Sequence, residues 1–238
     1  MQKDFDYLKW YLMISYAFSD YSILYQYIED DKAHDVHIDR YQDAFEKRHS
    51  DLGFKFVGTI REYQKGITRS MIRNSLLSFS NQMIVIYSTY IENIIKEYLT
   101  ILFINHPEKM SEYLIIRKNN EKLDGYISFN KVIENESKES LINSLAEESS
   151  THASKGDTKS VLKCLARLSN YTFSDESYKG IIRLIKLRNK IVHEFHKEVF
   201  GISEVKAYTK ITLDFLEQVK LAAQKNNLRI HDYIDSNK

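Results

Sequence analysis

Proline and cysteine are almost absent from this chain, which has one of each, Pro107 and Cys164, among 238 residues. Glycine is also scarce, at seven residues. Few positions therefore force the backbone out of a helix, and strong helix formers fill the long segments between them. A single cysteine excludes an intrachain disulfide and a zinc site built on several cysteines. These absences predict an all-α protein of a reducing compartment.

An excess of charge of one sign and long apolar runs are missing as well. The formal net charge is +1 and the pI is near 7.8, so a nucleic-acid partner has to be held by a local basic patch. No stretch reaches the ~18 uninterrupted apolar residues that a membrane-spanning helix needs. The first residues carry acids on both sides of their apolar positions and lack the small-residue cleavage pattern of a secretory signal. We expect a soluble cytoplasmic protein with no membrane partner.

Hydrophobic residues make up 43% of the chain, enough for one sizeable core, and we expect a single domain over residues 1–238. Apolar spacing predicts helices over about 4–28, 61–105, 158–170, 175–196 and 203–226. The helix over 61–105 is the most apolar and ends before Pro107, with a break expected near Gly66. Residues 30–60 and 108–170 are expected to be helical and loop insertions, with an exposed helix and a loop in the serine-rich stretch 134–160. The predicted fold is an antiparallel bundle of four to five core helices.

The helix predicted from residue 175 contains the sequence YKGIIRLIKLRNKIVHEF, which starts at residue 178. It carries an arginine where its apolar pattern calls for a leucine. At ~100° per residue, one broad arc holds its apolar side chains, with Arg188 at the centre; these are Ile181, Leu184, Ile185, Leu187, Ile191, Val192 and Phe195. Asn189 and His193, four residues apart, fall together at the edge of this arc.

A guanidinium on an apolar face requires a partner, because its desolvation costs several kcal/mol and it cannot discharge by losing a proton. Two interpretations follow. One is a structural ion pair with an acid of another helix, such as Glu92. The other is a crevice in which Arg188 meets a phosphate and His193 transfers a proton. The pattern alone barely separates these two interpretations.

Arg188, Asn189 and His193 form a short motif. It consists of an arginine, a polar residue directly after it, and a histidine that four residues separate from the arginine. Aliphatic residues precede the histidine, and a further amphipathic helix, ISEVKAYTKITLDFLEQVKL, follows. Upstream, YSTYIENIIKEYL places Glu92 and Lys96 one turn apart after an aromatic residue. These features, over about residues 70–105 and 175–220, resemble the HEPN superfamily (higher eukaryotes and prokaryotes nucleotide-binding). Within it the chain is most similar to ribonuclease toxins and anti-phage effectors.

The resemblance implies a metal-independent endoribonuclease that leaves 2′,3′-cyclic phosphate and 5′-hydroxyl ends on RNA such as tRNA or mRNA. It further implies a toxin of a toxin-antitoxin or anti-phage defence system, restrained by an antitoxin or regulatory protein, with no cofactor and no metal. His193 would act as base or acid, Arg188 would hold phosphate oxygens, and Asn189 would orient His193 or bind phosphate. In the family two protomers pair with their motifs facing a shared cleft, so we expect a homodimer.

Charge along this helix agrees with an RNA partner. From residue 179 to residue 197 the only acid is Glu194, against six basic residues, namely Lys179, Arg183, Lys186, Arg188, Lys190 and Lys197. Such a patch can follow a phosphate backbone, although each exposed lysine taken alone is also typical of a solvated helix face. We expect Lys186 and Lys190 to contact RNA.

Other assignments remain open at the level of sequence. Glu92 can polarise His193, pair with Arg188, or pair with Lys96 four residues later. His34 and His37 have the spacing of two metal ligands on one helical turn, but no further ligand set accompanies them. Two rival functions are a catalytically silent HEPN module, in which Arg188 and His193 hold a dimer or bind a nucleotide, and a helical adaptor unrelated to HEPN.

Overall fold

The computed structural model describes residues 3–50, 58–118, 135–194 and 201–232, and these residues are all-α, as the sequence predicts. The helices are α1 (Tyr7–Glu29), α2 (Asp31–Ser50), α3 (Gly58–Asn105), α4 (Glu108–Lys118), α6 (Lys138–Ala153), α7 (Thr158–Ser169), α8 (Asp175–His193) and α9 (Ile202–Lys225). Within these ranges no helix is both long and apolar enough to cross a membrane.

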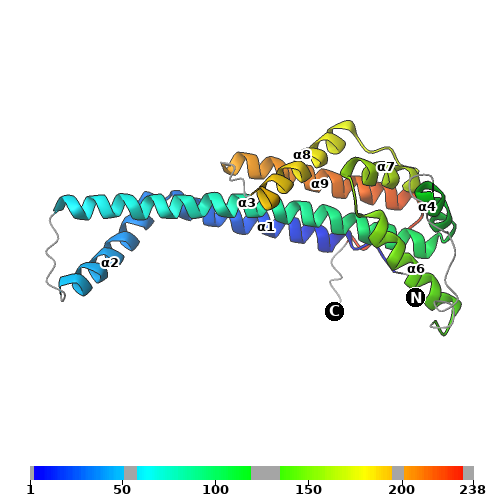
Figure 1. The fold of residues 1–238 in the computed structure, drawn as a ribbon, viewed down its shortest axis with the longest axis horizontal. Helices are drawn as coiled ribbons and strands as arrows, with labels where there is room; N and C mark the ends of the chain where they lie inside the picture. Colours follow the sequence, from blue (N-terminus) through cyan, green and yellow to red (C-terminus); the bar gives the residue numbers. More distant parts are fainter. Residues whose placement is uncertain (1–2, 51–57, 119–134, 195–200, 233–238) are drawn as a thin grey trace.

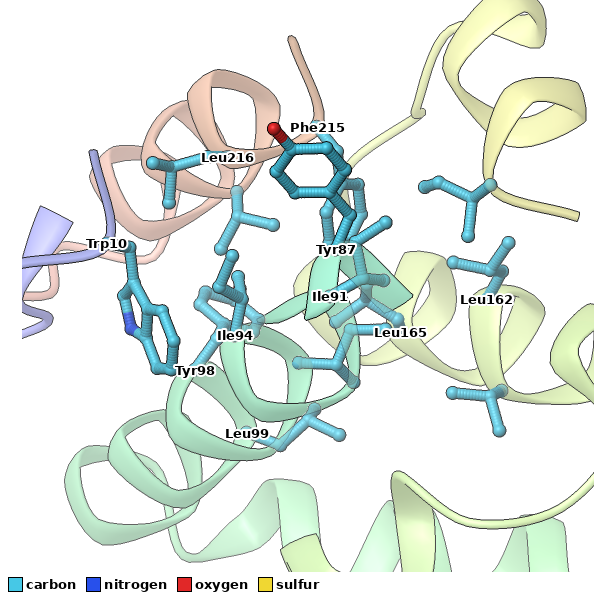
Figure 2. Close-up of a cluster of buried hydrophobic side chains, with 14 of the residues drawn as sticks. Trp10, Tyr87, Ile91, Ile94, Tyr98, Leu99, Leu162, Leu165, Phe215 and Leu216 are labelled. Atoms are coloured by element: carbon cyan, nitrogen blue, oxygen red, sulfur yellow. The ribbon is translucent and has the colours of Figure 1, made fainter. Parts of the chain in front are cut away.

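α3 is the axis of the molecule, and its C-terminal half is the centre of the core. This helix has 48 residues, and α1, α6, α8 and α9 pack along it (Figure 1). Figure 2 shows Tyr87, Ile91, Ile94 and Tyr98 of α3 among side chains from several other helices; the labelled neighbours are Trp10 of α1, Leu162 and Leu165 of α7, and Phe215 and Leu216 of α9. Other helices thus cover several faces of α3 at this level, where Tyr87, Ile91 and Ile94 are fully buried.

The segment before α1 and the segment after α9 meet beside this core. Phe5, which is fully buried, forms an isolated parallel bridge with Ile230. The Phe5 amide donates to the Arg229 carbonyl at 2.8 Å, and the His231 amide donates to the Phe5 carbonyl at 2.9 Å. Asp6 then caps α1 by accepting a hydrogen bond from the Lys9 amide at 3.0 Å, which satisfies one of the free donors of the first turn.

The break expected at Gly66 is wrong, because α3 runs without interruption from Gly58 to Asn105. One glycine inside a helix costs only about 1 kcal/mol relative to alanine. Ion pairs to α2 lie on either side of this position: Lys65 binds Asp39 at 2.7 Å, and Arg69 binds Asp35. α2 and the N-terminal half of α3 extend together beyond the rest of the molecule (Figure 1). This helical pair occupies most of the insertion predicted over residues 30–60.

The exposed helix expected in the serine-rich stretch is also corrected, because α6 packs against α3. Its buried residues are small, namely Ala146, Ser150 and Ala153. The hydroxyl of Thr100 on α3 donates to the Ser150 hydroxyl at 2.6 Å. Small side chains allow two helices to approach closely here, and Ile142 and Leu145 of α6 pack, partly buried, against the same core.

Candidate functional site

The N-terminal half of α8 is anchored in the core. Ser174 caps the helix by accepting a hydrogen bond from the Ser177 amide at 3.2 Å. Ile181 and Leu184 are buried. Gly180 lies against Ile211 of α9, and a Cβ placed there would be 3.0 Å from the Ile211 Cγ2 atom. The close approach at Gly180 fixes α8 on α9 and thereby sets the position of the motif, which begins about two turns later.

The C-terminal half of α8 leaves the core although its apolar spacing continues. Ile185, Leu187 and Ile191 are half-buried, and the Val192 side chain is 38% exposed. Arg188 is half-buried among them. The predicted arc is therefore real, but its second part forms a surface instead of a core. Phe195, which the sequence places on the same arc, lies outside the described residues.

Arg188 has no acidic partner within the part of the chain that the structure describes. Its Nη1 atom donates to the Asn189 side-chain oxygen at 3.0 Å. Its Nε atom is buried and has no hydrogen-bond partner among the described residues. A buried guanidinium donor that remains unused is costly. No acid of the described residues therefore neutralises this guanidinium.

His193 is the last residue of α8, and its side chain is exposed. Glu194 is the C-cap of the helix, and its amide donates a hydrogen bond to the Lys190 carbonyl at 3.0 Å. Asn189 is exposed too and lies one helical turn before His193. The amide and the imidazole thus lie one turn apart at the end of the helix, and Arg188 donates a hydrogen bond to the amide.

The remaining basic residues of α8 lie on its solvent face. Arg183, Lys186 and Lys190 are exposed. Lys179 pairs with Asp175 at 3.5 Å within the same helix, so part of its charge is compensated. Lys197 lies outside the described residues. The positive surface that faces solvent near the motif is therefore carried by Lys186 and Lys190, together with Arg183 further back.

Glu92 is half-buried on α3, the helix against which α8 packs. Among the described residues it forms no hydrogen bond or ion pair with Arg188 or His193. Lys96, the other candidate partner of Glu92, instead pairs with Glu147 of α6 at 3.0 Å. The structure brings Arg188, Asn189 and His193 together on one helix and leaves Glu92 unattached to them.

The chemistry available at this site is phosphate binding and proton transfer. A fork-shaped guanidinium suits phosphate oxygens, and an exposed imidazole can exchange protons near neutral pH. No group of three or more histidine, cysteine, aspartate or glutamate residues suited to a metal ion occurs within the described residues. The side chains of His34 and His37, the weak metal candidates, lie outside these residues.

A second polar region, which sequence reasoning missed, surrounds a cavity of about 600 Å³ between the start of α1, α3 and α6. The Glu97 carboxylate accepts hydrogen bonds there from Lys9 Nζ at 2.5 Å and Trp10 Nε1 at 3.1 Å. Glu97 and Trp10 lie 87 positions apart in the chain, so no local pattern pointed to their contact. The charges of Lys9 and Glu97, like those of Lys96 and Glu147, are already paired, which favours a structural role for these residues.

The candidate site is therefore the end of α8, defined by three side chains and a partly exposed apolar surface around them. Its relation to a known family rests on the resemblance of Arg188, Asn189 and His193 to the HEPN motif. No family model, curated protein or solved structure matches this chain.

Proposed function

We propose that this protein is a metal-independent endoribonuclease of the HEPN superfamily, built as a bundle of four to five core helices with insertions. The observation that carries the proposal is the state of Arg188. A structural ion pair was the competing explanation for an arginine on the apolar arc, and no acid pairs with it within the described residues. Its guanidinium lies instead beside Asn189, one turn from an exposed histidine.

The proposed reaction uses the 2′-hydroxyl of the RNA itself. The 2′-oxygen attacks phosphorus and the bond from phosphorus to the 5′-oxygen breaks, which leaves a 2′,3′-cyclic phosphate and a 5′-hydroxyl. A base removes the proton of the 2′-hydroxyl, and an acid protonates the departing 5′-oxygen. Arg188 stabilises charge on the phosphate oxygens in the transition state, Asn189 orients His193 or holds phosphate, and Lys186 and Lys190 bind neighbouring phosphates of the RNA.

One chain supplies one motif histidine, whereas this reaction benefits from both a base and an acid. A homodimer with the ends of its two α8 helices facing each other supplies a second His193 and a second Arg188. The partly exposed apolar surface around Val192 is suited to such a contact. Glu92 remains a candidate member of the site because it lies on α3, against which α8 packs.

The biological role that the resemblance supports is a cytoplasmic toxin of a toxin-antitoxin or anti-phage system. An RNA such as tRNA or mRNA is the substrate, and an antitoxin or regulatory protein restrains the enzyme until it is needed. Expression of the chain without its restraining partner should then arrest bacterial growth, and Arg188→Ala should relieve the arrest.

The decisive experiment incubates the purified protein with total RNA in excess EDTA and identifies the ends of the products. Cleavage should persist, with cyclic phosphate and 5′-hydroxyl ends, because no metal-bound water takes part. Arg188→Ala should lose this cleavage, and the matched control Arg183→Ala, on the exposed face of the same helix, should retain most of it. A requirement for Mg²⁺, products with 5′-phosphate ends, or equal loss in both variants would contradict the proposal.

A further inference from the structure

An exposed apolar seam runs along α1, far from the motif in sequence. Its members are Met13, Tyr16, Asp20, Ile23 and Tyr27, which are spaced by three, four, three and four residues. This is the a and d spacing of a heptad repeat, which places all five on one stripe of the helix. The apolar side chains on it are well exposed: 38% for Met13, 62% for Tyr16, 64% for Ile23 and 54% for Tyr27.

This seam is distinct from the face that α1 turns toward its own core. The buried residues of α1 are Trp10, Ile14, Tyr21 and Ile28, and the Tyr21 hydroxyl is hydrogen-bonded to the Ser80 hydroxyl of α3 at 2.8 Å. α1 thus has two apolar stripes, and α3 with its neighbours covers one of them. A heptad seam is a surface that packs against another helix, because its side chains otherwise keep their apolar area in water.

An apolar groove adjoins the seam. It lies between α1 and α3, has a volume of about 510 Å³, and shares Met13, Tyr16 and Asp20 with the seam. Phe79 of α3, which is 41% exposed, stands on its other wall. Asp20 is the one charged residue among the described residues that line it. The seam and the groove together form a continuous surface of the shape and chemistry that receives one more helix.

We infer that this surface binds a second copy of the chain, with α1 of each protomer lying in the groove of the other. The two α1 helices run antiparallel, with the two-fold axis beside Asp20. Met13 then lies level with the partner's Tyr27, and Tyr16 lies level with the partner's Ile23. Two pairs of helices, α1 with α3 and their symmetry mates, make a four-helix bundle, which is a common way for helical pairs to bury a shared apolar surface.

The spacing of the seam argues for a second copy over an unrelated helix. A two-fold interface sets the same surface against itself, so a seam with apolar residues at similar distances on both sides of its centre is self-complementary. Asp20 is at that centre, with Tyr16 and Met13 on one side and Ile23 and Tyr27 on the other. A polar residue at a single seam position fixes register and orientation while weakening the association. Asp20 is placed to do this.

The exposed area suits a weak but specific dimer. A buried aromatic side chain removes about 150–250 Å² from water, so a half-exposed one still offers roughly 100 Å². Met13 and Ile23 are of comparable size, so the four apolar seam residues and Phe79 together offer roughly 500 Å² per protomer and roughly 1,000 Å² in the dimer. That equals the minimum of about 1,000 Å² for a biological interface and lies below the about 1,200–2,000 Å² of stable ones.

The first test compares two tyrosines of α1 by light scattering on the intact protein. Tyr16→Glu should halve the mass of the assembly, because it buries a charge in the seam. Tyr11→Glu is the matched control: Tyr11 is 43% exposed but lies about 140° around the helix from Tyr16, so its variant should keep the mass. Circular dichroism shows whether both remain helical. An unchanged mass for folded Tyr16→Glu, or a monomeric wild type at high concentration, overturns the inference.

A second test is a gain of affinity, which a poorly folded variant cannot imitate. Two Asp20 carboxylates near one axis repel each other, by about 1 kcal/mol at close range in water. Asp20→Asn removes this repulsion and should lower the dissociation constant about fivefold. The matched control Glu29→Gln removes an exposed acid of α1 on the opposite side of the helix from Asp20 and should leave the constant unchanged. Equal effects of the two variants, or a weaker dimer with Asp20→Asn, overturn the proposed axis.

Cross-linking checks the same axis directly. Cys164 is the only native cysteine, and burial raises the pKa of its thiol to about 11; Cys164→Ser removes it from the experiment. In that background, Asp20→Cys should form a disulfide between protomers under mild oxidation, and Glu29→Cys should not. Arg188→Ala should leave the cross-link intact, which separates this interface from the proposed pairing of the α8 helices. Absence of a cross-link at position 20 overturns the inference.

Discussion

The two halves of α8 share one apolar spacing but lie in different surroundings. In the first half, Ile181 and Leu184 are buried in the core. In the second half, Ile191 and Arg188 are half-buried, and His193 is exposed. The same periodicity thus serves stability in one half and presents polar groups at a surface in the other. Substitutions in the first half should therefore lower the free energy of unfolding, and those in the second half should lower the rate of RNA cleavage.

The largest expected effect separates activity from stability. His193→Ala should lower the rate of RNA cleavage by about 10²–10⁴-fold, the usual contribution of a positioned general acid or base. The free energy of unfolding should change by less than about 0.5 kcal/mol, because the side chain is exposed and forms no hydrogen bond among the described residues. Single-turnover kinetics and urea unfolding measure the two quantities. A destabilised but fully active variant would reverse the assignment of the two halves.

The reverse pattern is expected from Leu184, which is fully buried in the first half of α8. Leu184→Ala should reduce the free energy of unfolding by about 2–5 kcal/mol, because it removes apolar contacts and leaves a cavity. Val192→Ala, the control in the second half, should cost less than about 1 kcal/mol because its side chain is partly exposed. Urea titration of both variants decides the matter, and equal losses would show that the second half is as tightly packed as the first.

A smaller effect is expected where α8 touches α9. In Gly180→Ala the new Cβ lies 3.0 Å from Ile211 Cγ2 and 3.2 Å from its Cγ1 and Cδ1 atoms. Overpacking of about 1–3 kcal/mol should exceed the gain of about 1 kcal/mol in helix propensity, for a net loss near 1 kcal/mol. Gly66→Ala is the matched control, since nothing lies within 4 Å of its Cβ position, and it should stabilise. In the double variant with Ile211→Ala, the loss at position 180 should largely disappear.

The sequence predicted the helices well because their apolar spacing and caps are local. The helix expected over 158–170 is α7 (Thr158–Ser169), with Asp157 as its N-cap and Asn170 closing it in the left-handed conformation. The same reasoning located Arg188 on the apolar arc. It could not predict how deeply each part of the arc is buried, because burial depends on where α8 crosses α3 and α9.

Features that depend on distant contacts escaped prediction altogether. Pairing with Lys96, one turn away, was one of three roles open to Glu92, but Lys96 pairs with Glu147 of α6. The buried residues of α6 include Ala146 and Ser150, and the Ser150 hydroxyl accepts a hydrogen bond from the Thr100 hydroxyl of α3. Side chains this small leave almost no mark on a hydrophobic pattern, so their packing is visible only in three dimensions.

The smallest expected effects are opposite changes in stability from substituting two serines at the start of α8. Ser177 is buried and its hydroxyl has no hydrogen-bond partner among the described residues, so Ser177→Ala removes an unsatisfied polar group and adds helix propensity. It should stabilise the protein by roughly 0.5–1 kcal/mol. Ser174→Ala should instead lower the free energy of unfolding by about 1 kcal/mol. The Ser174 hydroxyl accepts hydrogen bonds from the Ser177 amide at 3.2 Å and from the Gln218 side-chain nitrogen at 3.2 Å. Urea unfolding measures the sign of each change. Destabilisation by Ser177→Ala would mean that its hydroxyl has a partner in solution, and the contrast within this turn would then be lost.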